Sequence, residues 1–162
     1  MQISKVSDNK FQVKAKDGTV LATDDGIEIE GLKFTGPGEY ERKGIFVEGI
    51  LPDGEGSIFV VHTEEISMCF LGKISKLLSN EAIKSLGDID ILFVPIGADG
   101  SMKPQDAEKT VSTIDPRIVV PTHVDPAVNL ETALGTKVEE IDVFKIKKAE
   151  LPVEDRKLIL IS

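Results

Sequence analysis

The sequence is poor in the residues from which disulfide scaffolds, stacking surfaces and zinc centres are built. It has no Trp, one Tyr, one Cys and two His among 162 residues. One Cys cannot form an internal disulfide, a usage typical of a reducing compartment. That residue, Cys69, lies within an apolar run, which favours a buried thiol over a nucleophile. Sparse aromatic residues argue against a surface on which bases or sugars stack.

Long apolar runs and basic clusters are also missing. No stretch approaches the roughly 18 apolar residues of a membrane span, and residues 1–5 do not resemble a signal peptide. The net charge of −9 disfavours nucleic acid or an anionic membrane as the main partner. We therefore expect a cytoplasmic protein, and 162 residues suit one globular domain over 1–162.

The most informative stretch lies between residues 86 and 123. Ile91 to Val94 is a continuous apolar run, the pattern of a strand buried on both faces. Pro104 opens a segment with helical spacing, and Ile118 to Val120 is a second β-branched run. This order predicts a βαβ unit with two parallel strands. Ligands in such sheets gather beyond the carboxyl ends of the strands, so His123 lies where a site is expected.

Two loops are predicted to reach that edge of the sheet. Residues 95–99 follow the first strand of the unit, and residues 121–123 follow the second. A cleft between the loops would place Ile96, Gly97 and Asp99 near His123. Apolar side chains with a few convergent polar groups would make it a site for a small ligand, which the sequence does not identify.

The first half of the chain reads as short strands joined by turns. Alternating apolar residues and turn signals predict the strands 10–15, 19–22, 27–29, 44–50, 57–61 and 66–71. Residues 52–56 read as a solvated loop and residues 62–65 as a hairpin turn. Helices are predicted only later, over 80–86, over the segment that Pro104 opens, and from Asp125 to near Gly135. The tail predicts strands over 137–141, 143–146 and 157–161.

This order of elements favours an α/β (α+β) fold whose N-terminal half is mostly β. Two sheets packed face to face, with helices outside the second, would bury every apolar face.

Three blocks, in this order, resemble one branch of the metallo-β-lactamase-fold hydrolases. They are Gly36-Pro37-Gly38-Glu39-Tyr40-Glu41 with the following residues 43–50, then residues 86–97, then residues 115–123. The resemblance implies a β-sandwich with outer helices, the αββα fold of zinc-dependent hydrolases. It also implies one or two metals held between the sheets.

The family's metal ligands are mostly replaced in this chain. The family carries an HxHxDH motif upstream of the Gly-Pro-Gly-Glu-Tyr block, whereas residues 26–35 contain no His. A later family block reads roughly His-Leu-Gly-Asp, and Phe70 and Lys73 stand in place of its His and its ligand Asp. Only His123 matches a family ligand. The resemblance therefore implies a truncated αββα sandwich with a degenerate site, without the zinc that the family binds.

We interpret the chain as a hydrolase-like protein that has lost metal binding and catalysis and acts as a binding or structural module. In this hypothesis the Lys73 ammonium replaces the charge of the metal and pairs with a carboxylate such as Asp99. The alternative is a metal-dependent hydrolase with a non-standard or intersubunit site. Loss of the upstream helices should leave one sheet face apolar, so we expect a homo-oligomer, most simply a twofold dimer.

Overall fold

The computed structural model describes residues 1–52 and 56–162, so residues 53–55 of the predicted 52–56 loop lie outside it. The helices are α1 Asn80–Leu86, α2 Pro104–Ile114 and α3 Leu130–Leu134, with a 3₁₀ turn over Lys148–Glu150. The strands are β1 Gln2–Ser7, β2 Lys10–Lys14, β3 Thr19–Thr23, β4 Gly26–Ile29, β5 Leu32–Phe34, β6 Gly38–Arg42, β7 Ile45–Ile50, β8 Ile58–Thr63, β9 Ile66–Phe70, β10 Ile91–Pro95, β11 Ile118–Thr122, β12 Val138–Ile141, β13 Val143–Lys145 and β14 Lys157–Ile161.

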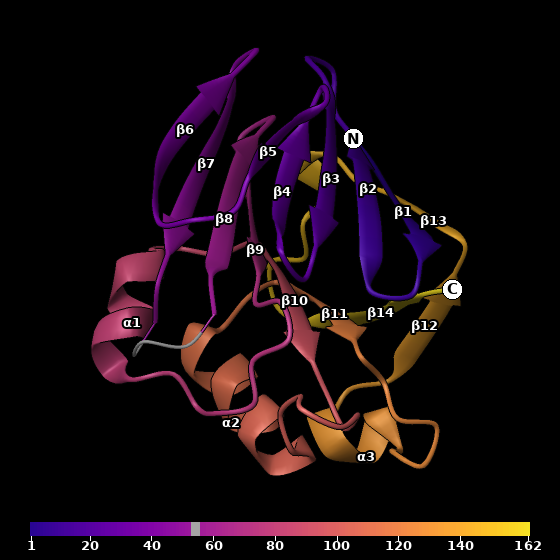
Figure 1. Ribbon diagram of the computed structural model, residues 1–162. Helices are drawn as coiled ribbons and strands as arrows, with labels where there is room; N and C mark the ends of the chain where they lie inside the picture. The colour runs from indigo at the N-terminus through magenta and orange to yellow at the C-terminus, as the bar shows by residue number, and fades with distance from the viewer. Residues whose placement is uncertain (53–55) are drawn as a thin grey trace.

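The strands form two sheets (Figure 1). The first sheet has the order β13-β1-β2-β3-β4-β5, and the second has the order β12-β14-β11-β10-β9-β8-β7-β6. The first sheet is antiparallel, whereas the centre of the second is parallel. The chain passes between the sheets three times along its length, from β5 to β6, from β12 to β13 and from β13 to β14.

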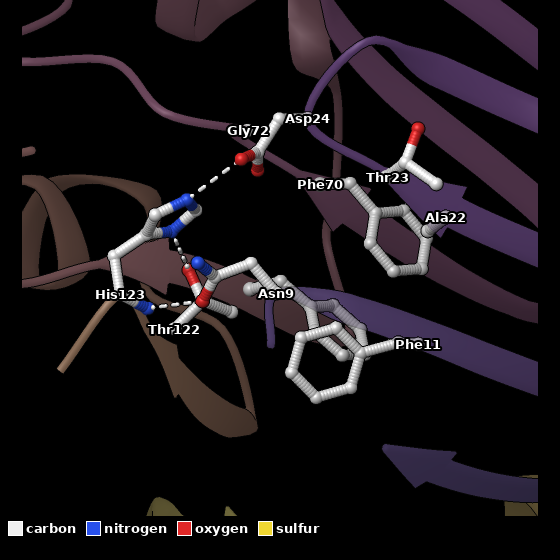
Figure 2. A pocket seen from close by; sticks show the side chains of 10 residues that line it. Asn9, Phe11, Ala22, Thr23, Asp24, Phe70, Gly72, Thr122 and His123 are labelled. Atoms are coloured by element: carbon white, nitrogen blue, oxygen red, sulfur yellow. Dashed lines mark hydrogen bonds and ion pairs between the residues drawn. The ribbon is translucent and has the colours of Figure 1, made fainter. Parts of the chain in front are cut away.

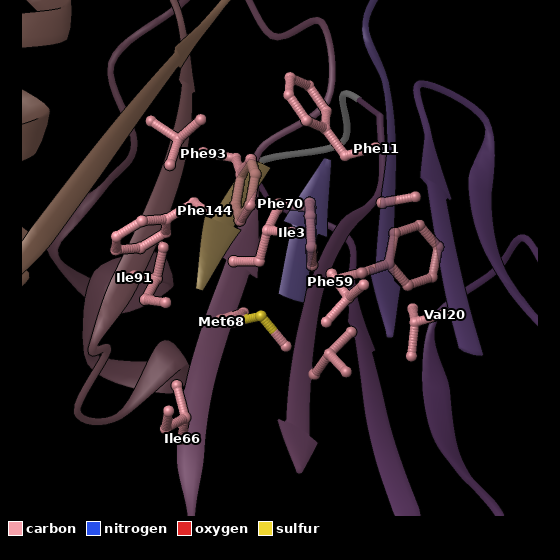
Figure 3. Packing of buried hydrophobic residues seen from close by; sticks show 14 of the residues in the cluster. Ile3, Phe11, Val20, Phe59, Ile66, Met68, Phe70, Ile91, Phe93 and Phe144 are labelled. Carbon is pink, nitrogen blue, oxygen red and sulfur yellow. The ribbon is translucent and has the colours of Figure 1, made fainter. Parts of the chain in front are cut away.

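The two sheets face each other across an apolar core. Ile3, Phe11 and Val20 of the first sheet belong to the same buried cluster as Phe70 and Phe93 of the second (Figure 3). The rings of Phe70 and Phe93 stack with centroids 4.2 Å apart, and Phe11 meets Phe93 edge-on at 5.2 Å. The sandwich expected from the alternating strands is therefore confirmed.

A second apolar cluster lies between the second sheet and the helices. Leu92 and Val94 of β10 pack there with Ala107 and Val111 of α2 and with Leu134 of α3. All three helices lie on this side of the molecule (Figure 1). In the described part of the chain the layers are thus sheet, sheet and helix, with no helix outside the first sheet. None of the helices described is long and apolar enough to cross a membrane.

The uncovered face of the first sheet is mostly polar, with Leu21 and Val143 as apolar exceptions, which corrects the expectation of an apolar face. Gln12, Leu21 and Glu28 lie side by side in register across β2, β3 and β4, and Gln12 also faces Ser4 of β1. Antiparallel sheets commonly bury one face and leave the other to water. Buried and water-facing residues alternate in these strands as that rule describes. The outer face of the first sheet therefore does not need a second copy of the chain to cover it.

The βαβ unit is present as predicted. Strands β10 and β11 pair in parallel, with Val94 opposite Pro121 and Pro95 opposite Thr122. The following loops are then joined by backbone hydrogen bonds, from Ile96 N–H to the Thr122 carbonyl at 2.9 Å. Both loops therefore reach the same edge of the sheet.

Some elements differ from those that the sequence predicts. Strands β1, β5 and β6 were not expected, and His62 lies in β8 rather than in a turn, because the turn is confined to Glu64 and Glu65. Helix α3 begins at Leu130, not at Asp125. The Asp125 carboxylate instead accepts a local hydrogen bond at 2.9 Å from the backbone N–H two residues later, which forms a turn.

We expect Phe93→Ala to lower the free energy of unfolding by about 3–5 kcal/mol, because it removes a ring between the two sheets and leaves a cavity. Urea denaturation measures the change. Val153→Ala is the matched control, since Val153 is 88% exposed and should change stability by less than about 0.5 kcal/mol. Equal effects of the two substitutions would contradict the proposed importance of the core.

Candidate functional site

His123 is the centre of a hydrogen-bond network at the edge of the second sheet (Figure 2). Its Nε2 lies 3.0 Å from Asp24 Oδ2, and its Nδ1 lies 3.0 Å from Thr122 Oγ1. An ionised carboxylate only accepts hydrogen bonds. We therefore assign a proton to Nε2, which donates a hydrogen bond to Asp24. In the neutral ring Nδ1 then carries no proton, and it accepts a hydrogen bond from the Thr122 hydroxyl. Both ring nitrogens are then engaged by the protein itself.

The backbone of His123 is held in an unusual conformation. Its φ is +50°, in the left-handed region that costs a residue with a side chain about 1–3 kcal/mol. The N–H donates to Asn9 Oδ1 at 2.9 Å, and the carbonyl accepts from Ala98 N–H at 3.1 Å. These contacts fix the direction of the imidazole ring. Asn9 and Asp24 lie in turns of the first sheet, so the network joins the edges of both sheets.

A small cavity lies beside this network. It has a volume of about 20 Å³, roughly enough for one water molecule. Its wall is formed by the network residues together with the rings of Phe11, Phe70 and Phe93 and the backbone of Gly72. The phenyl rings of the inter-sheet core thus extend to the imidazole.

The side chains around His123 do not fit a zinc site. Catalytic zinc takes about three protein ligands from His, Cys and carboxylate. His123 and Asp24 are two such groups, and the Phe70 ring adds no donor to the cavity that they line. Within residues 1–52 and 56–162, no three His, Cys, Asp or Glu side chains are grouped so that they could hold a metal ion.

Lys73 does not form the predicted ion pair. It is exposed, and its side chain lies along the backbone of Gly100, where a Cβ would be 3.1 Å from Lys73 Cε. Among the described residues it has no ion-pair partner, Asp99 included. A water-exposed ammonium is already solvated and does not need a carboxylate. The hypothesis that Lys73 closes the old site by pairing with Asp99 is therefore wrong.

The three residues predicted to form a cleft, Ile96, Gly97 and Asp99, do not line either of the two cavities described beside His123. Ile96 is fully buried in the cluster beneath the helices, and Asp99 is exposed. Gly97 is covered by the next loop, since a Cβ there would lie 2.6 Å from Val128 Cγ2. A larger cavity of about 290 Å³ does adjoin His123, between Lys5, Ala98 and Leu160.

Asp24 and Asn9 are the site residues that sequence reasoning missed. Asp24 lies 99 residues from His123 in the chain, and Asn9 lies 114 residues away. Both occupy turns, where Asp and Asn are common for local reasons. What distinguishes these two turns from others is their position at the edge of the first sheet that faces His123. That position can be recognised only when the order of the strands in the sheet is known.

Comparison with known proteins then places the fold in a family. The model of the beta-lactamase superfamily domain matches residues 3–123. The chain belongs to the metallo-β-lactamase superfamily. The match includes most of β1 and the whole of β2 to β5 in the first sheet, the βαβ unit and His123, so the resemblance stated for the three sequence blocks is confirmed.

Sequence relatives from the superfamily are longer than this chain. A UPF0173 metal-dependent hydrolase of Methanopyrus kandleri is 31% identical over 98 residues, covering 60% of this chain and 43% of the relative. One from Enterococcus faecalis is 26% identical over 104 residues, covering 59% and 46%. The aligned part of this chain thus spans less than half the length of these relatives.

Solved structures show that the short form of the fold occurs elsewhere. A metallo-β-lactamase superfamily protein of Thermotoga maritima aligns with a TM-score of 0.79 and 18% identity, over 99% of this chain and 97% of that one. Igni18, a metallo-hydrolase of Ignicoccus hospitalis, aligns with a TM-score of 0.64 and 12% identity, over 90% and 99%. At these identities the similarity establishes the fold alone.

We expect Asp24→Ala to lower the free energy of unfolding by about 1–2 kcal/mol, because the His123 N–H loses its partner. The loss is moderate because the Asp24 side chain is 38% exposed and water can enter. Asp25→Ala is the matched control, since Asp25 is 84% exposed and, among residues 1–52 and 56–162, its only ion pair is a 4.0 Å contact with Lys33. Chemical denaturation of both variants near neutral pH measures the difference, and equal stabilities would contradict the role given to Asp24.

Cys69 should be inert in the folded protein. It is fully buried beneath the helices, and burial raises the pKa of its thiol because the charged thiolate is desolvated. We expect a thiol reagent such as Ellman's reagent to modify Cys69 only after denaturant is added. Rapid modification without denaturant would show that the helix layer opens readily.

Proposed function

We propose that this chain is a metal-free member of the metallo-β-lactamase superfamily, in which a protein hydrogen-bond network takes the place of the metal centre. In this view it has lost metal-dependent catalysis and acts as a binding or structural module. The observation that carries the proposal is that both ring nitrogens of His123 are engaged, by Asp24 and by Thr122. A ligand nitrogen bound to the protein in this way is not free to bind an ion.

The surroundings of His123 support the same interpretation. Phe70 stands where the family block has a His, and its ring forms part of the inter-sheet core. The ligand Asp of that block is replaced by Lys73, an exposed cation. An ammonium offers no lone pair to a metal and repels it. Two positions of this block, one of them a ligand position, therefore carry groups that disfavour metal binding.

The network has a structural consequence. It connects the turn containing Asn9 and the turn containing Asp24, both in the first sheet, to the end of β11 in the second. We infer that it holds the loops at this edge in one arrangement, as a bound metal would otherwise do. Such an edge can present a fixed surface to a ligand or partner, and the cavity of about 290 Å³ beside Lys5 is the place for a small molecule.

Metal content is the direct test. Untagged protein is incubated with zinc and with manganese, freed of unbound ions and measured by elemental analysis. We expect a stoichiometry near zero for both metals. One or two ions per chain would instead support the alternative, a metal-dependent hydrolase with carboxylate or intersubunit ligands.

A reverse substitution provides the matched control. Phe70→His with Lys73→Asp restores the two residue types that the family block carries, beside a cavity that already contains His123 and Asp24. We expect this double variant to retain more zinc than the native chain, because it adds two zinc ligands. Retention of zinc by the native chain at the same level would contradict the proposal.

A further inference from the structure

The uncovered face of the first sheet carries positive charge, although the chain as a whole has a net charge of −9. Its outward positions include four lysines and one carboxylate, that of Glu28. We call this surface the lysine face, defined by Lys10, Lys14, Lys33 and Lys145. Lys33 lies 4.0 Å from Asp25, and among the described residues the other three lysines have no ion-pair partner. Half-buried Leu21 of β3 and exposed Val143 of the edge strand β13 lie on the same face.

The opposite side of the sandwich carries the complementary charge. In strands β6 and β7, Glu39 lies opposite Glu48 and Glu41 lies opposite Phe46. The alternate residues Tyr40 and Val47 pack against the inter-sheet core, so these four side chains lie on the outer side of the second sheet. We call this surface the glutamate face, defined by Glu39, Glu41, Phe46 and Glu48. The Phe46 ring is the exposed apolar group in it, with 56% of its surface accessible. His62 lies beside this face, with its Nε2 3.8 Å from the Glu48 carboxylate, and its ring carries a positive charge only when protonated.

We infer that these two faces bind each other in neighbouring copies of the chain, so that the protein associates head to tail. The lysine face and the glutamate face lie on the outer sides of different sheets, so one copy can use both at once. Pairing either face with itself would place like charges opposite one another, which is unfavourable. Stacking unlike faces pairs ammonium groups with carboxylates and lets Phe46 cover Leu21 or Val143.

This geometry changes the expected symmetry. A twofold dimer uses the same patch on both subunits, whereas two different complementary patches give a heterologous interface that forms a ring or an open chain. Both faces carry charges on the outer sides of strands, exposed to water, so the attraction is screened by salt. The assembly should therefore be strongest at low ionic strength.

Sedimentation velocity over a range of protein concentrations tests the inference. We expect the mass of the native chain to rise with concentration at about 0.02 M salt and to fall towards that of one copy at about 0.5 M salt, where the Debye length is only a few ångströms. Lys14→Glu with Lys145→Glu makes the lysine face acidic, and Glu41→Lys with Glu48→Lys makes the glutamate face basic. Each pair alone should weaken association at least tenfold.

Mixing the two variants gives the decisive result, because each then offers a face complementary to the other, and association should return. The matched control is Lys84→Glu with Lys109→Glu, which makes the same change in net charge on the exposed sides of α1 and α2 and should leave association in place. Circular dichroism confirms that all variants fold. A native chain that stays a single copy at low salt, a control that dissociates like the face variants, or a mixture that stays unassociated would overturn the inference.

Discussion

The apolar contact between the two sheets is the constraint on which the rest of this structure depends. Phe11, Phe70 and Phe93 fill the centre of that contact, and the same three rings line the cavity beside His123. Core and candidate site are therefore continuous. A phenyl ring at position 70 adds apolar area to the core, whereas a metal ligand there would have to remain polar. The fold can be stable without an ion because its burial does not depend on one.

The apolar core lowers the free energy of the fold, whereas the His123 network holds one residue in a backbone conformation that costs free energy. A left-handed φ at a residue with a side chain persists only where surrounding contacts fix it. Asn9, Ala98, Thr122 and Asp24 supply those contacts from four separate segments. In the function that we propose, the superfamily's site is kept as a position in the fold, and hydrogen bonds within the protein engage His123 in place of a metal.

Much of this architecture could be predicted from local pattern. The apolar run of β10 and the proline that opens α2 specify the βαβ unit, and its topology brings the loop of His123 to the ligand-binding edge. Strands β5 and β6 could not be predicted in this way, because β5 has only three residues and β6 carries mostly polar residues. The partners of His123 come from turns about a hundred residues away, which no local pattern connects. The alternation of Lys10, Gln12 and Lys14 did contain the signal of a water-facing side.

The most direct measurement of the central claim is a crystal structure grown with excess zinc and recorded at the zinc absorption edge. The account predicts no anomalous peak within bonding distance of His123, and a retained contact between its Nε2 and Asp24 near the present 3.0 Å. A peak bound by the imidazole, the Asp24 carboxylate and a third ligand from this chain or a neighbouring copy would contradict it. In that case the network around His123 would be the resting form of a metal site.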